Sequence, residues 1–152
     1  MIPKALTSFL EQGLSLHVGT RDEHLRPSGA RAAAVIVEPG GEHMLVFVAD
    51  VAVARLLDDI QRNGQLAVDF GRPEDDRACQ VKGIVVEVRA ARPDEHDVVL
   101  RQWQGFLVQL EKIGIPRQMA TGWAHWPATV IRIKVTAVFE QTPGPQAGMA
   151  IA

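Results

Sequence analysis

A few isolated cations are the residues of this sequence whose chemistry could bind a ligand. Arg31 lies in a run of small residues, Gly29-Ala-Arg-Ala-Ala-Ala, which leaves room for a ligand to approach the backbone. Arg55 falls in the first turns of a predicted helix, and Gln80 and Lys82 share one face of a predicted strand. Arginine can grip a phosphate through two parallel hydrogen bonds, so converging cations would suit a phosphorylated cofactor. The alternative is that these side chains lie on solvent-exposed strand faces and bind no ligand, because Lys and Arg are mostly exposed.

The spacing of the other reactive residues does not indicate metal or nucleophile chemistry. No two of the five histidines have the i, i+4 or His-x-His spacing of a chelating pair, so we expect no metal site. The Gly-x-Ser-x-Gly motif of hydrolases and the glycine-rich motifs of nucleotide-binding folds are also missing. The single cysteine, Cys79, has Ala78 and Val81 near it and is predicted to be a buried, unreactive thiol. No residue stands out as a catalytic acid or base.

The composition is that of an ordinary globular chain. Its 152 residues are 47% hydrophobic and 22% charged, so we expect one domain over residues 1–152. A net charge of −2 disfavours a nucleic-acid partner, and no apolar run reaches the roughly 20 residues that a membrane span needs. One cysteine cannot form an internal disulfide, and the first residues lack the order of a signal peptide. Both features predict a cytoplasmic protein without a membrane partner.

Hydrophobic periodicity predicts about six strands and three helices. The predicted helices cover about residues 3–12, 51–63 with Asp50 as N-cap, and 93–113; the predicted strands cover about 14–20, 29–37, 44–49, 65–70, 78–91 and 129–139. The second and third strands should form a hairpin closed at residues 39–41. The last strand should place residues 131, 133, 135, 137 and 139 on one face. The Pro- and Gly-rich tail, residues 141–152, is predicted to end strand pairing at residues 142–148.

The fifth predicted strand changes the phase of its alternation. Its polar residues are even-numbered before Gly83, as in Gln80 and Lys82, and odd-numbered after it, as in Glu87 and Arg89. A one-residue slip at a glycine is typical of a β-bulge that bends a strand around a barrel corner. With short turns between antiparallel neighbours, this predicts a mainly β fold, a small barrel with flanking helices.

Several segments, in their order along the chain, resemble the pyridoxamine 5′-phosphate oxidase-like family, the FMN-binding split barrels. The likeness covers roughly residues 5–148. It rests on Phe9-Leu-Glu-Gln-Gly-Leu-Ser-Leu-His-Val-Gly-Thr, Leu66-Ala-Val-Asp-Phe, Gln80-Val-Lys-Gly and Phe139-Glu-Gln-Thr-Pro-Gly-Pro-Gln-Ala-Gly. The resemblance implies a six-stranded antiparallel split barrel and a homodimer that binds FMN at the subunit interface. It also implies a flavin-dependent oxidoreductase acting on a small-molecule substrate.

The resemblance also implies which residues contact the cofactor. These are Arg31, Arg55 and Lys82 at the phosphate, Gln80 near the flavin ring or ribityl chain, and Trp123 and Trp126, from the partner subunit, in the wall of the ring pocket.

The sequence departs from the family pattern at three places. The lysine expected five residues after Arg31 is Ile36, and the phosphate-binding segment at residues 50–55 has no Ser or Thr and begins with Asp50. The arginine-rich C-terminal motif of the true oxidase is missing, so pyridoxamine phosphate oxidation is not expected. Two alternatives stay open. The first is a dimeric split-barrel binding module that has lost flavin and catalysis, and the second is an unrelated all-β barrel enzyme.

Overall fold

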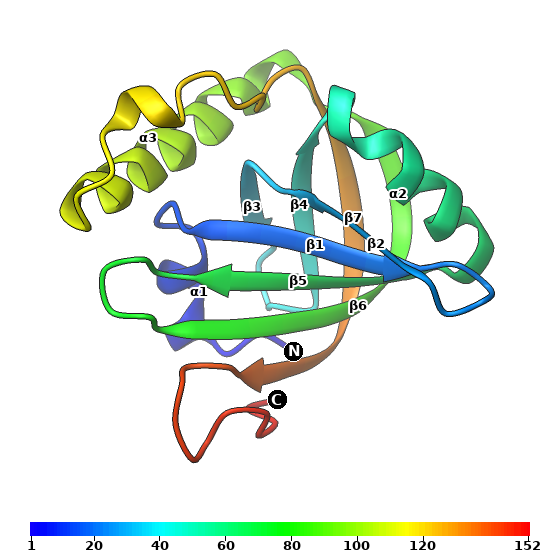
Figure 1. Cartoon of the computed structure of the whole chain (residues 1–152). Coiled ribbons are helices and arrows are strands. Elements are labelled where there is room, and N and C mark those ends of the chain that lie inside the picture. The colour runs from blue at the N-terminus through cyan, green and yellow to red at the C-terminus, as the bar shows by residue number, and fades with distance from the viewer.

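The computed structural model describes all residues from Met1 to Ala152, and it is built around one curled sheet (Figure 1). Its elements are α1 (Lys4–Leu10), β1 (Ser15–Arg21), β2 (Pro27–Arg31), β3 (Ala34–Val37), β4 (His43–Ala49), α2 (Asp50–Asn63), β5 (Gln65–Gly71), β6 (Ala78–Ala90), the 3-10 turn η1 (Pro93–Glu95), α3 (His96–Lys112), the 3-10 turn η2 (Arg117–Met119) and β7 (Ala128–Glu140). All three predicted helices are present, and the predicted hairpin joins β3 to β4.

The seven strands form one sheet in the order β2-β1-β5-β6-β7-β4-β3, and every neighbouring pair is antiparallel. The two edge strands, β2 and β3, are separated by only Ala32 and Ala33. The Ala32 N–H donates to the Leu16 carbonyl of β1, and the Ala33 N–H donates to the Phe47 carbonyl of β4. The chain therefore crosses from one edge of the sheet to the other and closes the barrel. This crossing divides the predicted strand 29–37 in two, which is why there are seven strands and not six.

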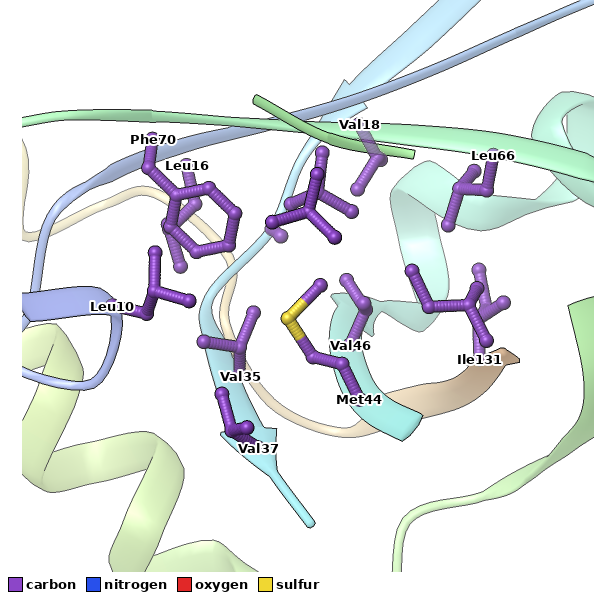
Figure 2. Packing of buried hydrophobic residues seen from close by; sticks show 14 of the residues in the cluster. Leu10, Leu16, Val18, Val35, Val37, Met44, Val46, Leu66, Phe70 and Ile131 are labelled. Carbon is purple, nitrogen blue, oxygen red and sulfur yellow. The ribbon is translucent and has the colours of Figure 1, made fainter. Parts of the chain in front are cut away.

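Alternate side chains of the strands fill the barrel with one hydrophobic core (Figure 2). Leu16 and Val18 of β1, Met44 and Val46 of β4, and Phe70 of β5 are among the core residues. Helices α1 and α2 each add three buried apolar residues to the same core. Every predicted strand therefore contributes side chains to this core from one of its faces, as expected because successive side chains of a strand point to opposite faces.

Helix α3 packs on the outside of the barrel and covers only half of it. Its Val99 joins a second cluster with Ala34, Phe47 and Val130, which lie on β3, β4 and β7. The Gln102 side chain donates to the Val35 carbonyl at 2.6 Å and accepts from the Val35 N–H at 3.1 Å, so α3 supplies the partners that edge strand β3 lacks. Phe106 of α3 reaches the outer face of β2 only at Arg31, and no helix lies over the outer face of β1, β5 and β6 (Figure 1).

Two irregularities interrupt the pairing of β6 with β7. At Lys82/Gly83 the extra residue is Thr136 of β7, and between Val85 and Glu87 it is Val86 of β6. The phase of β6 therefore changes at Val86, three residues later than predicted. Gly83 is required for a different reason: a Cβ there would lie 2.7 Å from the Lys134 carbonyl oxygen.

The extra residue in β7 also corrects the predicted alternation of the last strand. Beyond Thr136, Val138 points into the core and Ala137 pairs with Lys82 on the outer face. Phe139 pairs with Gln80 on that same outer face, whereas the sequence placed it with the inward Ile133. The bulge thus brings an aromatic ring out beside Lys82.

One further expectation is corrected at the end of β4, and the predicted end of strand pairing after β7 is confirmed. Asp50 is the first residue of α2 and caps no N–H; its carboxylate accepts a hydrogen bond from the Thr129 hydroxyl at 2.8 Å. The predicted tail does leave the sheet after Glu140, but the chain returns, and Ala150 forms an isolated bridge with Phe139. Beyond the end of β4, no strand pairs with this edge of β7, and the returning C-terminal chain covers it. No helix of the structure is long and apolar enough to cross a bilayer.

Candidate functional site

A row of polar side chains crosses the uncovered outer face of the barrel. The strand registers place His17 of β1 opposite both Arg31 of β2 and Asp69 of β5, and they place Asp69 opposite Gln80 of β6. Arg31 Nη1 lies 3.3 Å from His17 Nε2, and Gln80 Nε2 donates to Asp69 Oδ1 at 2.7 Å. Four neighbouring strands therefore build one continuous polar row. His17 and Asp69 were missed in the sequence because only the register reveals that they are neighbours.

The guanidinium group of Arg31 lies against two aromatic rings that stack on each other. Its Cζ lies 4.8 Å from the centre of the Phe106 ring, on α3, and 4.5 Å from that of Trp123. Trp103 extends this wall, with its ring centre 5.7 Å from that of Phe106. Arg31 forms no ion pair with a carboxylate, and burial lowers its pKa, although a guanidinium stays charged in proteins. The result is a positioned, half-buried cation without a counter-ion.

The contact with Arg31 fixes the protonation of His17. A guanidinium can only donate hydrogen bonds, so His17 Nε2 must be the acceptor and the proton of the neutral ring is on Nδ1. Desolvation, and then the positive charge of Arg31, lower the pKa of His17 below its usual 6.5, while Asp69 opposes this change. His17 is therefore neutral at pH 7 and adds no charge to the row.

Beside this row the outer face is hollowed, with a volume of about 470 Å³. The residues that line the hollow are Gly19, Thr20, Arg21, Gln65, Leu66, Ala67, Lys82, Gly83, Ile84 and Thr136. Gly19 and Ala67 leave its floor without bulky side chains, and the two charged residues, Arg21 and Lys82, are both positive. Because no carboxylate lines the hollow, it is suited to an anion.

The structure brings three of the predicted site residues to the same face. Gln80 and Lys82 lie on the outer face of β6, as their spacing predicted, and Arg31 lies on the outer face of β2. Strands β1 and β5 separate Arg31 from Lys82, so the two backbones are about 14 Å apart, three times the spacing of neighbouring strands. In this structure the Arg31 guanidinium lies against Phe106 and Trp123, whereas the Lys82 ammonium lies over the Phe139 ring.

The structure places Arg55 and Trp126 away from that face. Arg55 is exposed on α2 in a charged pocket at the β1–β2 turn, together with Asp22, Glu23, His24, Arg26, Asp58, Asp59 and Arg62. Trp126 packs against His96 at the start of α3, with ring centres 4.6 Å apart and the ring planes tilted by 46°. Trp123 contacts Arg31 within the same chain, so its ring does not need a partner subunit to reach this face. No group of His, Cys, Asp or Glu in the chain could hold a metal ion.

Cys79 lies on the inner side of β6 and takes no part in this face. It is buried in the core, and burial raises the pKa of its thiol from 9.0 to about 12. We expect the thiolate fraction, and with it the rate of labelling by a disulfide reagent at pH 8, to be about a thousand-fold lower in the folded protein than in urea. Absorbance of the released thiolate measures this rate. The same shift means that stability is lost as the pH rises from 9.0 towards 12, because only the unfolded chain ionises there.

Labelling of the folded protein at the rate of an unfolded control would contradict this burial.

Known structures share this fold. No family model matches the chain, and no curated protein matches its sequence. An F420 reductase is 19% identical and superposes with a TM-score of 0.57 over 90% of this chain and 98% of that one. A proposed pyridoxamine 5′-phosphate oxidase from Lactobacillus delbrueckii is 14% identical, with a TM-score of 0.56 over 91% and 93%. An FMN-binding protein from Syntrophomonas wolfei is 10% identical, with a TM-score of 0.53 over 90% and 86%. Such identities show the fold alone, and they confirm the predicted split barrel.

Proposed function

We propose that this protein binds FMN on the outer face of β2, β1, β5 and β6 and serves as a flavin-dependent oxidoreductase for a small molecule. The observation that carries the proposal is the hollow, in which Arg21 and Lys82 stand beside a floor of small residues with no carboxylate. Two positive side chains with no carboxylate beside them match the charge of a phosphate dianion. Small residues on the floor of the hollow let a flat ring lie close to the backbone of the strands. One structure with the same fold is named an FMN-binding protein, which supports the same ligand.

The residues of this face fit the parts of such a cofactor. Arg21 and Lys82 would hold the phosphate, and Gly19 and Ala67 would let the ring and ribityl chain lie against the backbone. The bond from Gln80 Nε2 to Asp69 orients the Gln80 amide, and its Oε1 is left to accept a hydrogen bond from the ring. A bound flavin would supply the hydride or electron transfer, while the protein positions it and excludes water.

The start of α2, where the family resemblance places the phosphate, fits less well. Asp50 puts a carboxylate at this position, the segment contains no hydroxyl, and Arg55 lies in a pocket with several acidic side chains. A phosphate there would meet a like charge at close range. The hollow supplies two cations without a carboxylate; Thr20 and Thr136 also line it, with their hydroxyls donating to Asn63 and to the Lys82 carbonyl.

We also propose that a second copy of the chain covers this face. Ile84 lines the hollow and is 43% exposed, and Val86 on the same strand is 48% exposed. Covering these apolar side chains would exclude water from the hollow. Sedimentation velocity at micromolar concentration tests this proposal: a dimer supports it, and a monomer that stays monomeric with FMN contradicts it.

Binding of FMN is tested best against riboflavin, which has the same ring but no phosphate. We expect FMN to bind at least about tenfold more tightly, since one charge-assisted hydrogen bond contributes about 1.5–3 kcal/mol. Quenching of flavin fluorescence measures both dissociation constants. The melting temperature should rise with FMN concentration, because a ligand that binds only the folded state stabilises it.

Equal affinity for the two flavins would overturn the assignment of the hollow as a phosphate site. Absence of binding by either flavin would favour the second candidate function, a split-barrel binding module without flavin. The specific observation in favour of that module is Asp50 at the start of α2, where a phosphate would be repelled.

A further inference from the structure

We infer that Arg31 forms a subsite for the carboxylate group of an organic substrate, separate from the phosphate hollow. The inference rests on the proposed function in one respect: the substrate is taken to lie beside the flavin on the same outer face. The family resemblance placed Arg31 at the cofactor phosphate, and its distance from Lys82 argues against that role within one chain.

The contacts of the Arg31 guanidinium group leave most of its N–H donors for a ligand. Phe106 and Trp123 contact the group through their rings, and His17 Nε2 accepts from one of its five N–H donors. The other donors have no partner within the protein. Held in this way, the group loses little rotamer freedom when it binds, and its planar fork matches the two oxygens of a carboxylate.

A half-buried charge without a counter-ion is costly to keep. Most arginines of this chain form ion pairs, as Arg89 does with Glu95 and Arg132 with Glu38. Arg31 has no such partner, although burial penalises its charge. An anion that binds from solvent would supply the missing counter-charge.

The local balance of charge selects a monoanion. The polar row holds one cation, Arg31, a neutral His17 and one carboxylate, Asp69, two strands away from Arg31. Asp69 repels either anion, but it repels a phosphate dianion twice as strongly as a carboxylate, and Arg31 neutralises only half of the dianion's charge. The hollow differs because it contains two cations and no acidic residue. The phosphate would therefore bind in the hollow and the carboxylate at Arg31, at different places on one face.

The ring of Trp123 adds a preference for the body of the ligand. Its side chain is 41% exposed while it stacks against Phe106, with ring centres 6.1 Å apart. An exposed indole beside a carboxylate site favours a flat or apolar group next to the carboxylate. Benzoate has both features and is a suitable probe.

The test compares benzoate with benzamide, a neutral molecule of the same shape, on the folded protein without flavin. Two-dimensional NMR of nitrogen-15-labelled protein follows the Nε–H of Arg31 and the indole N–H of Trp123. We expect benzoate to shift both signals in a saturable way and benzamide to shift them at least tenfold less at the same concentration. This comparison needs no variant, so it stays decisive even where a substitution disturbs folding. Equal shifts with the two compounds, or none with benzoate, would overturn the inference.

An Arg31→Gln variant then locates the site, with Arg55→Gln as a control that removes an arginine elsewhere. The Trp123 indole signal reports benzoate binding in both variants. We expect Arg31→Gln to weaken benzoate binding at least tenfold and to leave FMN affinity within about threefold, whereas Arg55→Gln changes neither. Loss of FMN binding in Arg31→Gln with unchanged benzoate binding would return Arg31 to the cofactor and overturn the inference. If the wild type binds benzoate at Arg31 but no flavin, the carboxylate subsite stands and the proposed function fails.

Discussion

A variant that lacks both cations of the hollow, Arg21→Ala with Lys82→Ala, is expected to bind FMN at least about 100-fold more weakly than the wild type. Each charge-assisted hydrogen bond to a phosphate contributes about 1.5–3 kcal/mol, so two together exceed the 2.7 kcal/mol that corresponds to a factor of 100. Both side chains line the hollow from the outer face of the barrel, and neither forms an ion pair that its loss would break. Fluorescence titration measures the change.

The same variant should bind riboflavin within about threefold of the wild type, because that ligand has no phosphate. A matched control is Arg55→Ala, which also removes an arginine but lies in the charged pocket beside α2. If Arg55→Ala weakens FMN binding as much as the double variant does, the phosphate lies at the start of α2, as the family resemblance implied, and our placement is wrong.

Gly13→Ala is expected to destabilise the protein by about 2–5 kcal/mol. This loss is the sum of two costs, a left-handed backbone at a residue with a Cβ and a steric clash of that Cβ. Gly13 has φ +88°, and a Cβ at this position would lie 2.8 Å from the Phe106 amide nitrogen and would run into the Gln102 carbonyl oxygen. The loop after α1 therefore crosses α3 with backbone against backbone, and Gly105 is the residue of α3 that permits the approach. Chemical denaturation followed by circular dichroism measures the loss.

Gly114→Ala separates the two contributions. Gly114 has φ +82° and follows the end of α3, but nothing lies within 4 Å of the position of its Cβ. This control should lose only the backbone contribution, about 1–2 kcal/mol. Equal losses in the two variants would show that α3 can move away from Gly13 at no cost. Since α3 carries Phe106, such a movement would also loosen the contact with Arg31.

The sequence predicted most of the fold because the signals involved are local. The core-facing positions of β7 up to Val135 follow from alternation, the continuous apolar run of β4 predicts a strand buried on both faces, and Gly64 and Gly114 end α2 and α3 with positive φ. The predictions of secondary structure are wrong where contacts with a distant part of the chain determine the strand boundaries or the register. Residues 29–37 are one strand by composition, but two separate partners, Leu16 and Phe47, divide them. The extra residue at Thr136 is set by the pairing of β7 with β6, so no alternation within β7 reveals it.

For the candidate site, residue types and their spacing indicated the cations that stand among small or apolar residues, and they pointed to Arg31, Gln80 and Lys82. Which of these are neighbours depends on the folded barrel. The structure added Arg21, His17 and Asp69, and it placed Arg55 and Trp126 elsewhere. The physical reason is that alternation and helix-end residues act over a few positions, whereas strand register joins residues that are far apart in the chain. In this barrel the register places Asp69 beside His17, the packing of α3 places Phe106 against Arg31, and the chemistry of the face depends on both contacts.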